Sequence, residues 1–173
     1  MLKVRYTDKE LNELLDTAIM IVDTREQKNQ HITDYFNSKE ISYIERKLDY
    51  GDYAIMLPAN QELGISKDMY LNATIERKNS VDELASTISD RVRFNNELLR
   101  ATGSDFHMIV EDSAGYENLI LGNYRSKFKP YSLLASLKSL EARYSFNTAF
   151  ISKKTAGNYI YHHLRYRLRE QLK

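Results

Sequence analysis

Four carboxylates and one lysine lie where three apolar runs of the sequence begin or end. Asp23 and Glu26 follow the first run, and Asp52 precedes the second. Glu76 and Lys78 close the third. Carboxylate oxygens are the ligands that Mg²⁺ and Mn²⁺ prefer, and a lysine beside such an ion can orient an attacking water or neutralise charge on a phosphoryl transition state. The pattern therefore predicts a metal-dependent nuclease.

The spacing of Glu76 and Lys78 matters because alternate residues of a strand point to the same face. Both side chains should therefore share one face, while Arg77 points to the other. Each piece by itself is common: Gly51-Asp52 is an ordinary turn dipeptide, and a Glu-Arg-Lys run is usually a solvated group of charges. Only the combination, in this order along one chain, favours a metal centre completed by an aspartate from a neighbouring strand.

Apolar periodicity predicts the elements that carry these residues. Six strands are expected, at residues 19–23, 41–48, 53–57, 71–77, 108–110 and 149–151. Five helices are expected, at residues 7–17, 30–39, 81–101, 130–144 and 155–172. Residues 58–70 are predicted to be an exposed hairpin loop, and residues 113–129 an irregular segment. This order predicts an α/β fold with a mixed central β-sheet flanked by helices, as a single domain over residues 1–173 without a helix-hairpin-helix or helicase region.

The prediction also includes details of strand order, of a helix cap and of the apolar faces of the helices. The strands at 41–48, 53–57 and 71–77 are candidates for an antiparallel meander. Ser80 and Glu83 match a capping box at the start of the third helix, whose apolar stripe would include Val92 and Leu99. The apolar stripes of the last two helices have two interpretations, since they suit either a dimer interface or the intramolecular core.

The composition excludes several functions. The 173 residues include no cysteine, which excludes disulfides, thiol catalysis and cysteine-based zinc sites. No run approaches about 18 apolar residues, and Met1–Arg5 lack the apolar core of a signal peptide. We therefore expect no membrane contact and a cytoplasmic protein, nucleoid-associated if its source is prokaryotic or a phage. No glycine-rich phosphate loop is present, so no nucleotide cofactor is expected. His162 and His163 lack partners at metal spacing and are assigned to the surface or an interface.

The charge is spread unevenly, although the net charge is only +1. Residues 1–122 hold 14 basic and 22 acidic side chains, while residues 123–173 hold 11 basic and 2 acidic ones. An acidic metal-binding part followed by a basic part suits a protein that cuts a polyanion; a basic helix that only keeps the protein soluble is the alternative. The segment 124–129 interleaves aromatic and basic residues, as single-stranded DNA binding requires, although it also suits a solvated loop. The basic residues predicted to bind DNA on these grounds are Arg125, Lys127, Lys129, Lys153 and Lys154.

The residues also resemble a known family. A Glu-x-Lys on a strand with an aspartate from a neighbouring strand is the restriction-endonuclease-like arrangement. More narrowly, Val22–Glu26, Gly51-Asp52 and the run Glu76-Arg77-Lys78-x-x-x-Asp82 resemble the XPF-type structure-specific endonucleases. The resemblance continues through Asp90–Phe94, where Asp90 replaces the family's usual glycine, and covers roughly residues 19–171.

The resemblance implies roles for individual residues. Asp23, Glu26, Asp52 and Glu76 match metal-site carboxylates, and Lys78 matches the catalytic lysine. With Asp52, Glu76 and Lys78, Arg77 is assigned to the catalytic group. The residues that match DNA-binding or site-supporting positions are Asp82, Arg91 and Arg93. A structural ion pair is an equally open interpretation of Asp82 and Arg91. Glu111 is interpreted as a strand-end charge or a supporting partner rather than a ligand.

The function implied is cleavage of DNA phosphodiesters with Mg²⁺ or Mn²⁺, at branched, flap or single-strand/duplex junction DNA. Repair, recombination and the processing of phage or mobile-element DNA are the settings expected. The resemblance also implies a homodimer or heterodimer through the nuclease domain. Two alternatives are a non-catalytic DNA-binding subunit of a nuclease complex and a protein-interaction module on the same fold.

Overall fold

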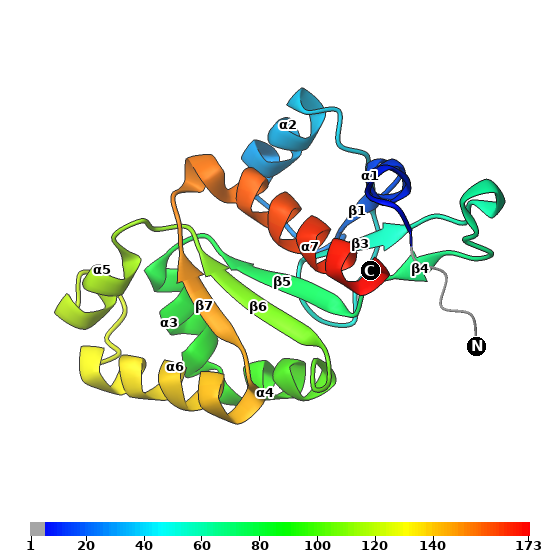
Figure 1. The fold of residues 1–173 in the computed structure, drawn as a ribbon. Coiled ribbons are helices and arrows are strands. Elements are labelled where there is room, and N and C mark those ends of the chain that lie inside the picture. Colours follow the sequence, from blue (N-terminus) through cyan, green and yellow to red (C-terminus); the bar gives the residue numbers. More distant parts are fainter. Residues whose placement is uncertain (1–5) are drawn as a thin grey trace.

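A seven-stranded mixed β-sheet organises the protein, as seen in a computed structural model that describes residues 6–173 (Figure 1). The strands lie in the order β2-β1-β3-β5-β6-β7, and the short β4 pairs with β3. Their bounds are β1 Ile19–Val22, β2 Tyr43–Glu45, β3 Tyr53–Leu57, β4 Met69–Tyr70, β5 Ala73–Lys78, β6 Asp105–Val110 and β7 Asn147–Phe150. The predicted mixed sheet flanked by helices is thereby confirmed.

Strand direction brings the polar strand ends together. β3 is antiparallel to both of its neighbours in the central sheet, β1 and β5. Tyr53 at the start of β3 lies opposite Val22 at the end of β1 and opposite Ile75 in β5. The carboxyl ends of β1 and β5 therefore meet the amino end of β3 at one edge of the sheet. The residues that follow β1, precede β3 and close β5 are those predicted to do chemistry.

Helices cover the sheet in two layers (Figure 1). The helices α1 (Asp8–Asp16), α2 (Gln30–Ser38) and α7 (Ala156–Leu172) pack together on one face, with α7 against β3 and β5. The other layer consists of α3 (Val81–Ser89), α4 (Arg91–Arg100), α5 (Gly115–Leu121) and α6 (Pro130–Tyr144). Two 3₁₀ turns, at Gln61–Leu63 and Lys153–Thr155, complete the described elements.

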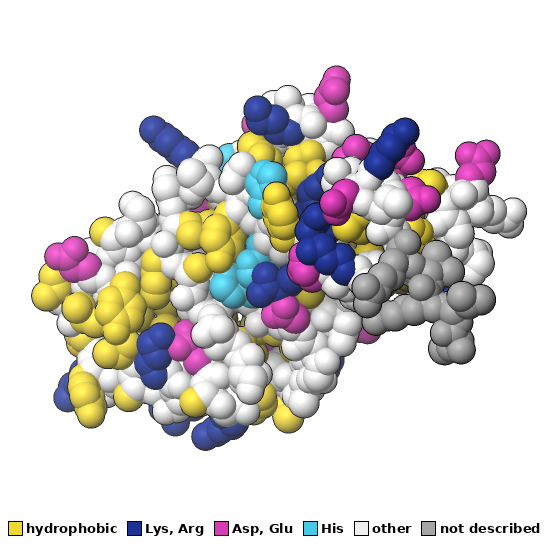
Figure 2. All heavy atoms as spheres, viewed as in Figure 1, with side chains coloured by type: hydrophobic (Ala, Val, Ile, Leu, Met, Phe, Trp, Pro, Cys, Tyr) yellow, Lys and Arg dark blue, Asp and Glu magenta, His cyan; other side chains and the backbone are white. Residues whose placement is uncertain are grey.

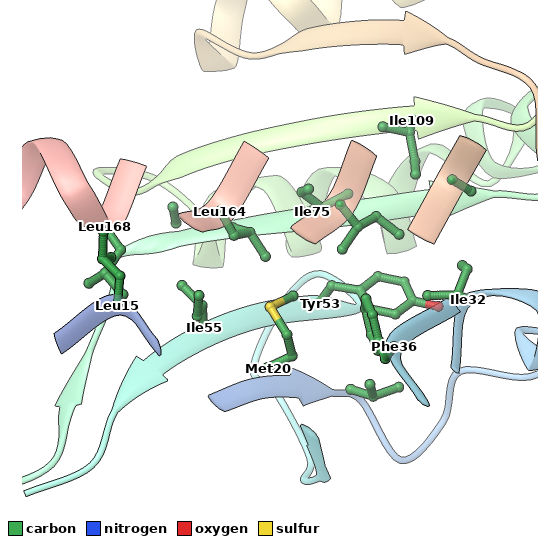
Figure 3. Close-up of a cluster of buried hydrophobic side chains, with 14 of the residues drawn as sticks. Leu15, Met20, Ile32, Phe36, Tyr53, Ile55, Ile75, Ile109, Leu164 and Leu168 are labelled. Carbon is green, nitrogen blue, oxygen red and sulfur yellow. The ribbon is translucent and has the colours of Figure 1, made fainter. Parts of the chain in front are cut away.

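The final helix belongs to the main hydrophobic core. Leu164 and Leu168 are fully buried, and they lie with Ile75 of β5 and Leu15 of α1 in one apolar cluster (Figure 3). Of the two interpretations of the apolar stripe of α7, the intramolecular core is therefore the one that the structure supports. Replacing Leu164 by a charged residue would disrupt the fold itself, so such a variant cannot test dimerisation.

Two expected features of the sheet were wrong. The strands at 41–48, 53–57 and 71–77 do not form a meander, because β1 lies between β2 and β3 and pairs with β2 in parallel. The strand expected over 41–48 is also only three residues long. Its later residues leave the sheet because the backbone of Leu48 turns to donate a hydrogen bond to the Asp23 carboxylate.

The helix expected over 81–101 is two helices. The chain breaks at Asp90, whose backbone is not helical and whose side chain accepts a hydrogen bond from the Arg93 amide at the start of α4. The break rotates the second half, so Val92 and Leu99 are exposed while Phe94 is buried. Ser80 caps α3 as predicted.

The segment expected to be irregular at 113–129 contains α5, a short helix that ends at Gly122 in the left-handed conformation. The other helices lie close to their predicted bounds. None of the helices within residues 6–173 is long and apolar enough to cross a membrane. The prediction made on Met1–Arg5, that they lack a signal-peptide core, lies outside the described residues.

Two histidines stack between the sheet and α7. The rings of His107 in β6 and His163 in α7 are 4.3 Å apart between centroids, and His107 Nε2 lies 2.9 Å from the Tyr159 hydroxyl. Histidine side chains are visible over α7 in Figure 2. Burial lowers the pKa of His107 to about 4, with the Arg167 charge adding to this. Burial likewise lowers the pKa of His163 to about 4, with His107 adding to this.

These shifts predict acid-sensitive stability. An unfolded histidine has a pKa of about 6.5, so between pH 6.5 and 4 the unfolded chain binds more protons than the folded one. The contribution of these two histidines to the free energy of unfolding should therefore fall as the pH falls through this window, by up to about 1.4 kcal/mol per pH unit for each histidine. Urea unfolding from pH 4.5 to 7 measures this. The slope should be shallower in His163→Phe and unchanged in His162→Phe, which alters an exposed histidine; equal slopes in both variants would contradict the prediction.

Candidate active site

The polar strand ends line one cleft of about 380 Å³. Asp52 comes from the start of β3, Glu76 and Lys78 from the end of β5, and Glu26 from the loop after β1. The helix layer closes another side with Glu83 of α3 and with Arg93, Glu97 and Arg100 of α4. The structure thus brings all four predicted carboxylates, Asp23 included, and the predicted lysine to one cleft.

Gly51 allows Asp52 to approach β5. Its φ of 71° lies in the left-handed region, and a Cβ there would stand 2.8 Å from the Thr74 Cβ. The close approach lets the Asp52 amide donate to the Ile75 carbonyl at 2.8 Å, while Asp52 Oδ2 accepts from the Arg77 amide at 2.8 Å. Backbone hydrogen bonds therefore hold the Asp52 carboxylate beside the closing residues of β5.

Glu76 and Lys78 occupy the same face of β5, as their spacing predicts. Lys78 Nζ contacts Glu76 Oε1 directly, and both side chains are buried. Burial raises the pKa of Glu76 well above its usual range, and the Asp52 carboxylate adds to this. Burial also raises the pKa of Asp52 to about 8, with the charge of Glu26 as the next cause. Burial opposes the charge of Lys78, but the Glu76 and Asp52 carboxylates outweigh it and raise the pKa of Lys78. Lys78 therefore compensates the carboxylates only in part, and Asp52 and Glu76 hold their protons to a higher pH than free carboxyl groups do.

Arg77 points to the opposite face and fixes the loop after β1. Its guanidinium contacts the Glu26 carboxylate, donates to the Gln27 carbonyl at 2.8 Å and donates to Glu111 Oε2 at 2.9 Å. Glu111 is buried and also lies 2.6 Å from His31 Nε2. Glu111 thus serves here as a supporting partner, which agrees with its predicted role.

Asp23 makes different contacts from the other carboxylates. Its oxygens accept hydrogen bonds from the Arg25 side chain and amide, and from the Leu48 amide at 2.6 Å. Although burial works against it, the Arg25 hydrogen bond holds the pKa of Asp23 below its usual value. In this arrangement Asp23 ties the loop after β1 to the loop before β3. Its role as a metal ligand stays a prediction.

The donor chemistry fits a hard divalent cation, because Glu26, Asp52 and Glu76 offer only carboxylate oxygens. Within residues 6–173, however, no three acidic or histidine side chains stand in a metal-binding arrangement. The geometry gives the reason: Lys78 contacts Glu76, and Arg77 contacts Glu26. A bound ion would compete with these two contacts for the same oxygens.

The other predicted residues separate into three places. Asp82 accepts hydrogen bonds from the amides of Arg125 and Ser126 and pairs with the Arg125 guanidinium, so it anchors the loop before α6. The Arg125 amide is the main cause that lowers the pKa of Asp82. Arg93 lines the cleft, but Arg91 does not. The exposed cations Lys127, Lys129, Lys153 and Lys154 lie outside the cleft lining.

Three arginines of α7 are committed to ion pairs within the chain. Arg165 pairs with Asp16, Arg167 with Asp105, and Arg169 with Asp8. The basic excess of the C-terminal third is therefore partly neutralised by acidic residues from earlier in the sequence. Sequence patterns alone gave no means of finding these long-range pairs.

Glu97 is a cleft residue that the sequence prediction missed. It accepts a hydrogen bond from the Gly51 amide at 3.3 Å and its charge contributes to the raised pKa of Glu76. Glu97 stands four residues after Arg93, so both share one face of α4. The shared face follows from the spacing alone, but its direction into the cleft depends on the helix break at Asp90, which the sequence did not predict.

Comparison with known proteins agrees with this architecture. A model of the ERCC4 domain matches residues 22–163, so the chain belongs to the ERCC4 domain family, a family of DNA nucleases. No curated protein matches the sequence.

Among solved structures, the fold is similar to that of XPF from Aeropyrum pernix, with a TM-score of 0.61 and 21% identity over 87% of this chain. It is also similar to XPF from Aeropyrum pernix in complex with DNA, with a TM-score of 0.59 and 20% identity over 88% of this chain. This chain covers 65% of each of those chains. The predicted resemblance to an XPF-type nuclease domain is therefore confirmed at the level of family and fold.

The geometry at Gly51 predicts a measurable effect on stability. Gly51→Ala should place a Cβ against Thr74 on a left-handed backbone, whereas Gly103→Ala is a matched control, with φ of 87° and no atom within 4 Å of the added Cβ. The control should cost about 1–2 kcal/mol from the backbone alone, and Gly51→Ala about 1–3 kcal/mol more from overpacking. Chemical denaturation measures both. Equal losses of stability would contradict the prediction, because they would mean that Thr74 of β5 moves away from the added Cβ at no cost.

Proposed function

We propose that this protein is a metal-dependent DNA endonuclease that hydrolyses phosphodiester bonds. The observation that carries the proposal is the convergence of Asp52, Glu76 and Lys78 in one cleft. Two elements of the fold place these groups, the start of β3 and the end of β5, and their burial together costs stability unless a cation or a substrate uses them. Branched, flap or single-strand/duplex junction DNA is the proposed substrate class, in repair, recombination or the processing of phage or mobile-element DNA.

Glu26, Asp52 and Glu76 would hold one or two Mg²⁺ or Mn²⁺ ions, with Asp23 as a further predicted ligand. When bound, such an ion supplies an activated water and charge neutralisation at the phosphate. Asp52 is held by backbone hydrogen bonds, so its carboxylate keeps a defined position. Arg77 positions Glu26 through the direct contact described above.

Lys78 is proposed to act on the reacting phosphate. Its ammonium already faces the carboxylate cleft, and it retains its charge because Glu76 and Asp52 raise its pKa. Release from Glu76 would leave a positive group beside the position of the scissile phosphate. There it can stabilise the charge that develops on the phosphoryl oxygens and orient the attacking water. The expected products carry a 5′-phosphate and a 3′-hydroxyl.

The basic rim of the cleft favours DNA as the substrate. Arg93 and Arg100 of α4, together with Lys28 of the loop after β1, line the opening around the carboxylates. Cations at the rim attract the phosphate backbone, while the carboxylates at the centre would repel it without a bound metal. This arrangement supports a catalyst over a non-catalytic DNA-binding subunit or a protein-interaction module, because neither of these needs buried acidic groups.

Single variants of the cleft test the proposal. Asp52→Asn and Glu76→Gln keep the shape of each side chain but remove an anionic oxygen, so cleavage with Mg²⁺ or Mn²⁺ should be lost. Lys78→Ala should slow the chemical step roughly 100- to 1,000-fold, the scale of one transition-state-stabilising group, and weaken DNA binding much less. Asp34→Asn, an exposed aspartate of α2, is the matched control and should cut normally.

The measurement is single-turnover cleavage of single-stranded, duplex, flap and four-way-junction DNA, with binding followed in parallel. Cleavage by a folded Asp52→Asn protein at the parental rate would overturn the assignment of Asp52. A parent protein that binds these DNAs but never cuts them would be the non-catalytic subunit. A parent that does neither would be an interaction module.

Dimerisation is a further part of the proposal. Tyr116, Ile120 and Leu121 of α5 and Tyr131 of α6 expose large apolar side chains, and hydrophobic atoms gather over these helices and β7 on the left of Figure 2. β7 is also an edge strand of the sheet. We therefore expect Leu121→Glu to lower the molar mass seen by light scattering from dimer to monomer. Leu99→Glu, an equally exposed leucine of α4, should leave it unchanged; a monomeric parent would contradict the dimer.

A further inference from the structure

A second groove, with a volume of about 330 Å³, lies between α4 and α6. Ile88, Phe94 and Leu140 supply its apolar lining, and its polar lining consists of Arg91, Asn95, Ser136, Ser139 and Arg143. No carboxylate lines it, in contrast to the active-site cleft. Its electrostatic character is therefore purely positive.

The two arginines of this groove are available for a ligand. Arg91 and Arg143 are exposed, and neither forms an ion pair or hydrogen bond with another side chain in the described part of the chain. By contrast, Arg77 and the three arginines of α7 pair with acidic residues. An arginine without an internal partner keeps all the N–H donors of its guanidinium free to bind a phosphate.

The α6 side of the groove is also built for hydrogen bonding to an anion. Ser136, Ser139 and Arg143 follow one another at spacings of three and four residues, so they share one face of the helix. Neither serine hydroxyl is engaged by another described residue. Across the groove, Asn95 Oδ1 accepts from the Tyr144 hydroxyl at 3.4 Å, which orients the amide. Hydroxyl, amide and guanidinium groups are those that contact DNA phosphates.

The groove lies close to the active-site cleft. A third hollow over the junction of α3 and α4 shares Glu76, Lys78 and Arg93 with the cleft and meets the groove at the buried Phe94. The carboxylates Glu83, Asp90 and Glu97 also line this hollow. Arg93 lines the cleft and Arg91 lines the groove, so the two arginines at the start of α4 face different hollows. A strand that leaves the cleft across this junction would reach Arg91 and Arg143.

We propose that the groove between α4 and α6 binds the phosphodiester backbone of a DNA arm that extends from the cleaved site. The proposal rests on the nuclease function proposed above and assigns the groove as its second phosphate-binding site. The groove offers donors for phosphates but no flat aromatic face, since Phe94 is buried. Binding here should therefore be independent of base sequence. It should also require a substrate long enough to extend beyond the cleft.

The test measures DNA binding as a function of salt. Arg91→Gln/Arg143→Gln is compared with Lys39→Gln/Lys67→Gln, which removes the same charge from exposed lysines outside the groove. All proteins also carry Asp52→Asn to prevent cleavage, and a fluorescent duplex is titrated at several salt concentrations. Losing two duplex phosphate contacts should reduce the slope of log K against log salt by up to about 1.8. The control should retain the slope of the Asp52→Asn parent.

Two outcomes overturn the proposal: a salt slope in the arginine variant equal to that of the lysine control, or an altered oligomeric state with unchanged DNA binding. Cleavage of substrates of graded length, with Asp52 restored, provides a second measurement. The arginine variant should cut short substrates at the parental rate and lose activity only on long ones. Equal rates at every length would remove the groove from the substrate path while leaving the nuclease function intact. A parent that fails to cut at all would instead refute the nuclease function itself.

Discussion

The ion pair between Arg77 and Glu26 connects the two halves of the candidate active site. Arg77 is buried on the face of β5 opposite Glu76 and Lys78, and its guanidinium reaches Glu111 as well as the loop after β1. Burying a charge is costly unless it is paired, so these contacts allow carboxylates to approach one another at the sheet edge. The same pairing restrains the loop that carries Glu26 without occupying the face on which Lys78 lies.

The topology of the sheet explains why one edge can hold so much charge. β3 runs against both of its neighbours, so the ends of β1 and β5 and the start of β3 coincide. Each of these three strand ends contributes an acidic residue. Polar residues are tolerated there because the chain is leaving the apolar core. Gly51 then brings the backbone of β3 close enough to β5 for Asp52 to share hydrogen bonds with it. A buried site is thus assembled from short segments that are individually unremarkable in sequence.

Sequence reasoning predicted the elements and the shared face of Glu76 and Lys78, because both follow from local periodicity. It failed where a distant or local polar contact overrode that periodicity. The break at Asp90 is one such case, since a capping hydrogen bond restarts the helix and exchanges Val92 for Phe94 on the buried side. The order of the strands is another, because pairing across the sheet depends on contacts between segments far apart in the chain. The hydrogen bond from the Arg25 side chain to the Asp23 carboxylate could likewise not be predicted from the sequence.

Charge distribution in the folded protein differs from charge distribution along the chain. The sequence separates an acidic part from a basic one, but α7 packs against the acidic part and pairs Arg165 and Arg169 with aspartates of α1. Cations that meet acidic partners in this way contribute little to the attraction of a polyanion. The positive field that remains comes from residues without such partners, among them Arg91 and Arg143. A count of basic residues therefore overstates the positive charge that α7 presents to a polyanion, whereas the proposed groove between α4 and α6 keeps its two arginines without acidic partners among the described residues.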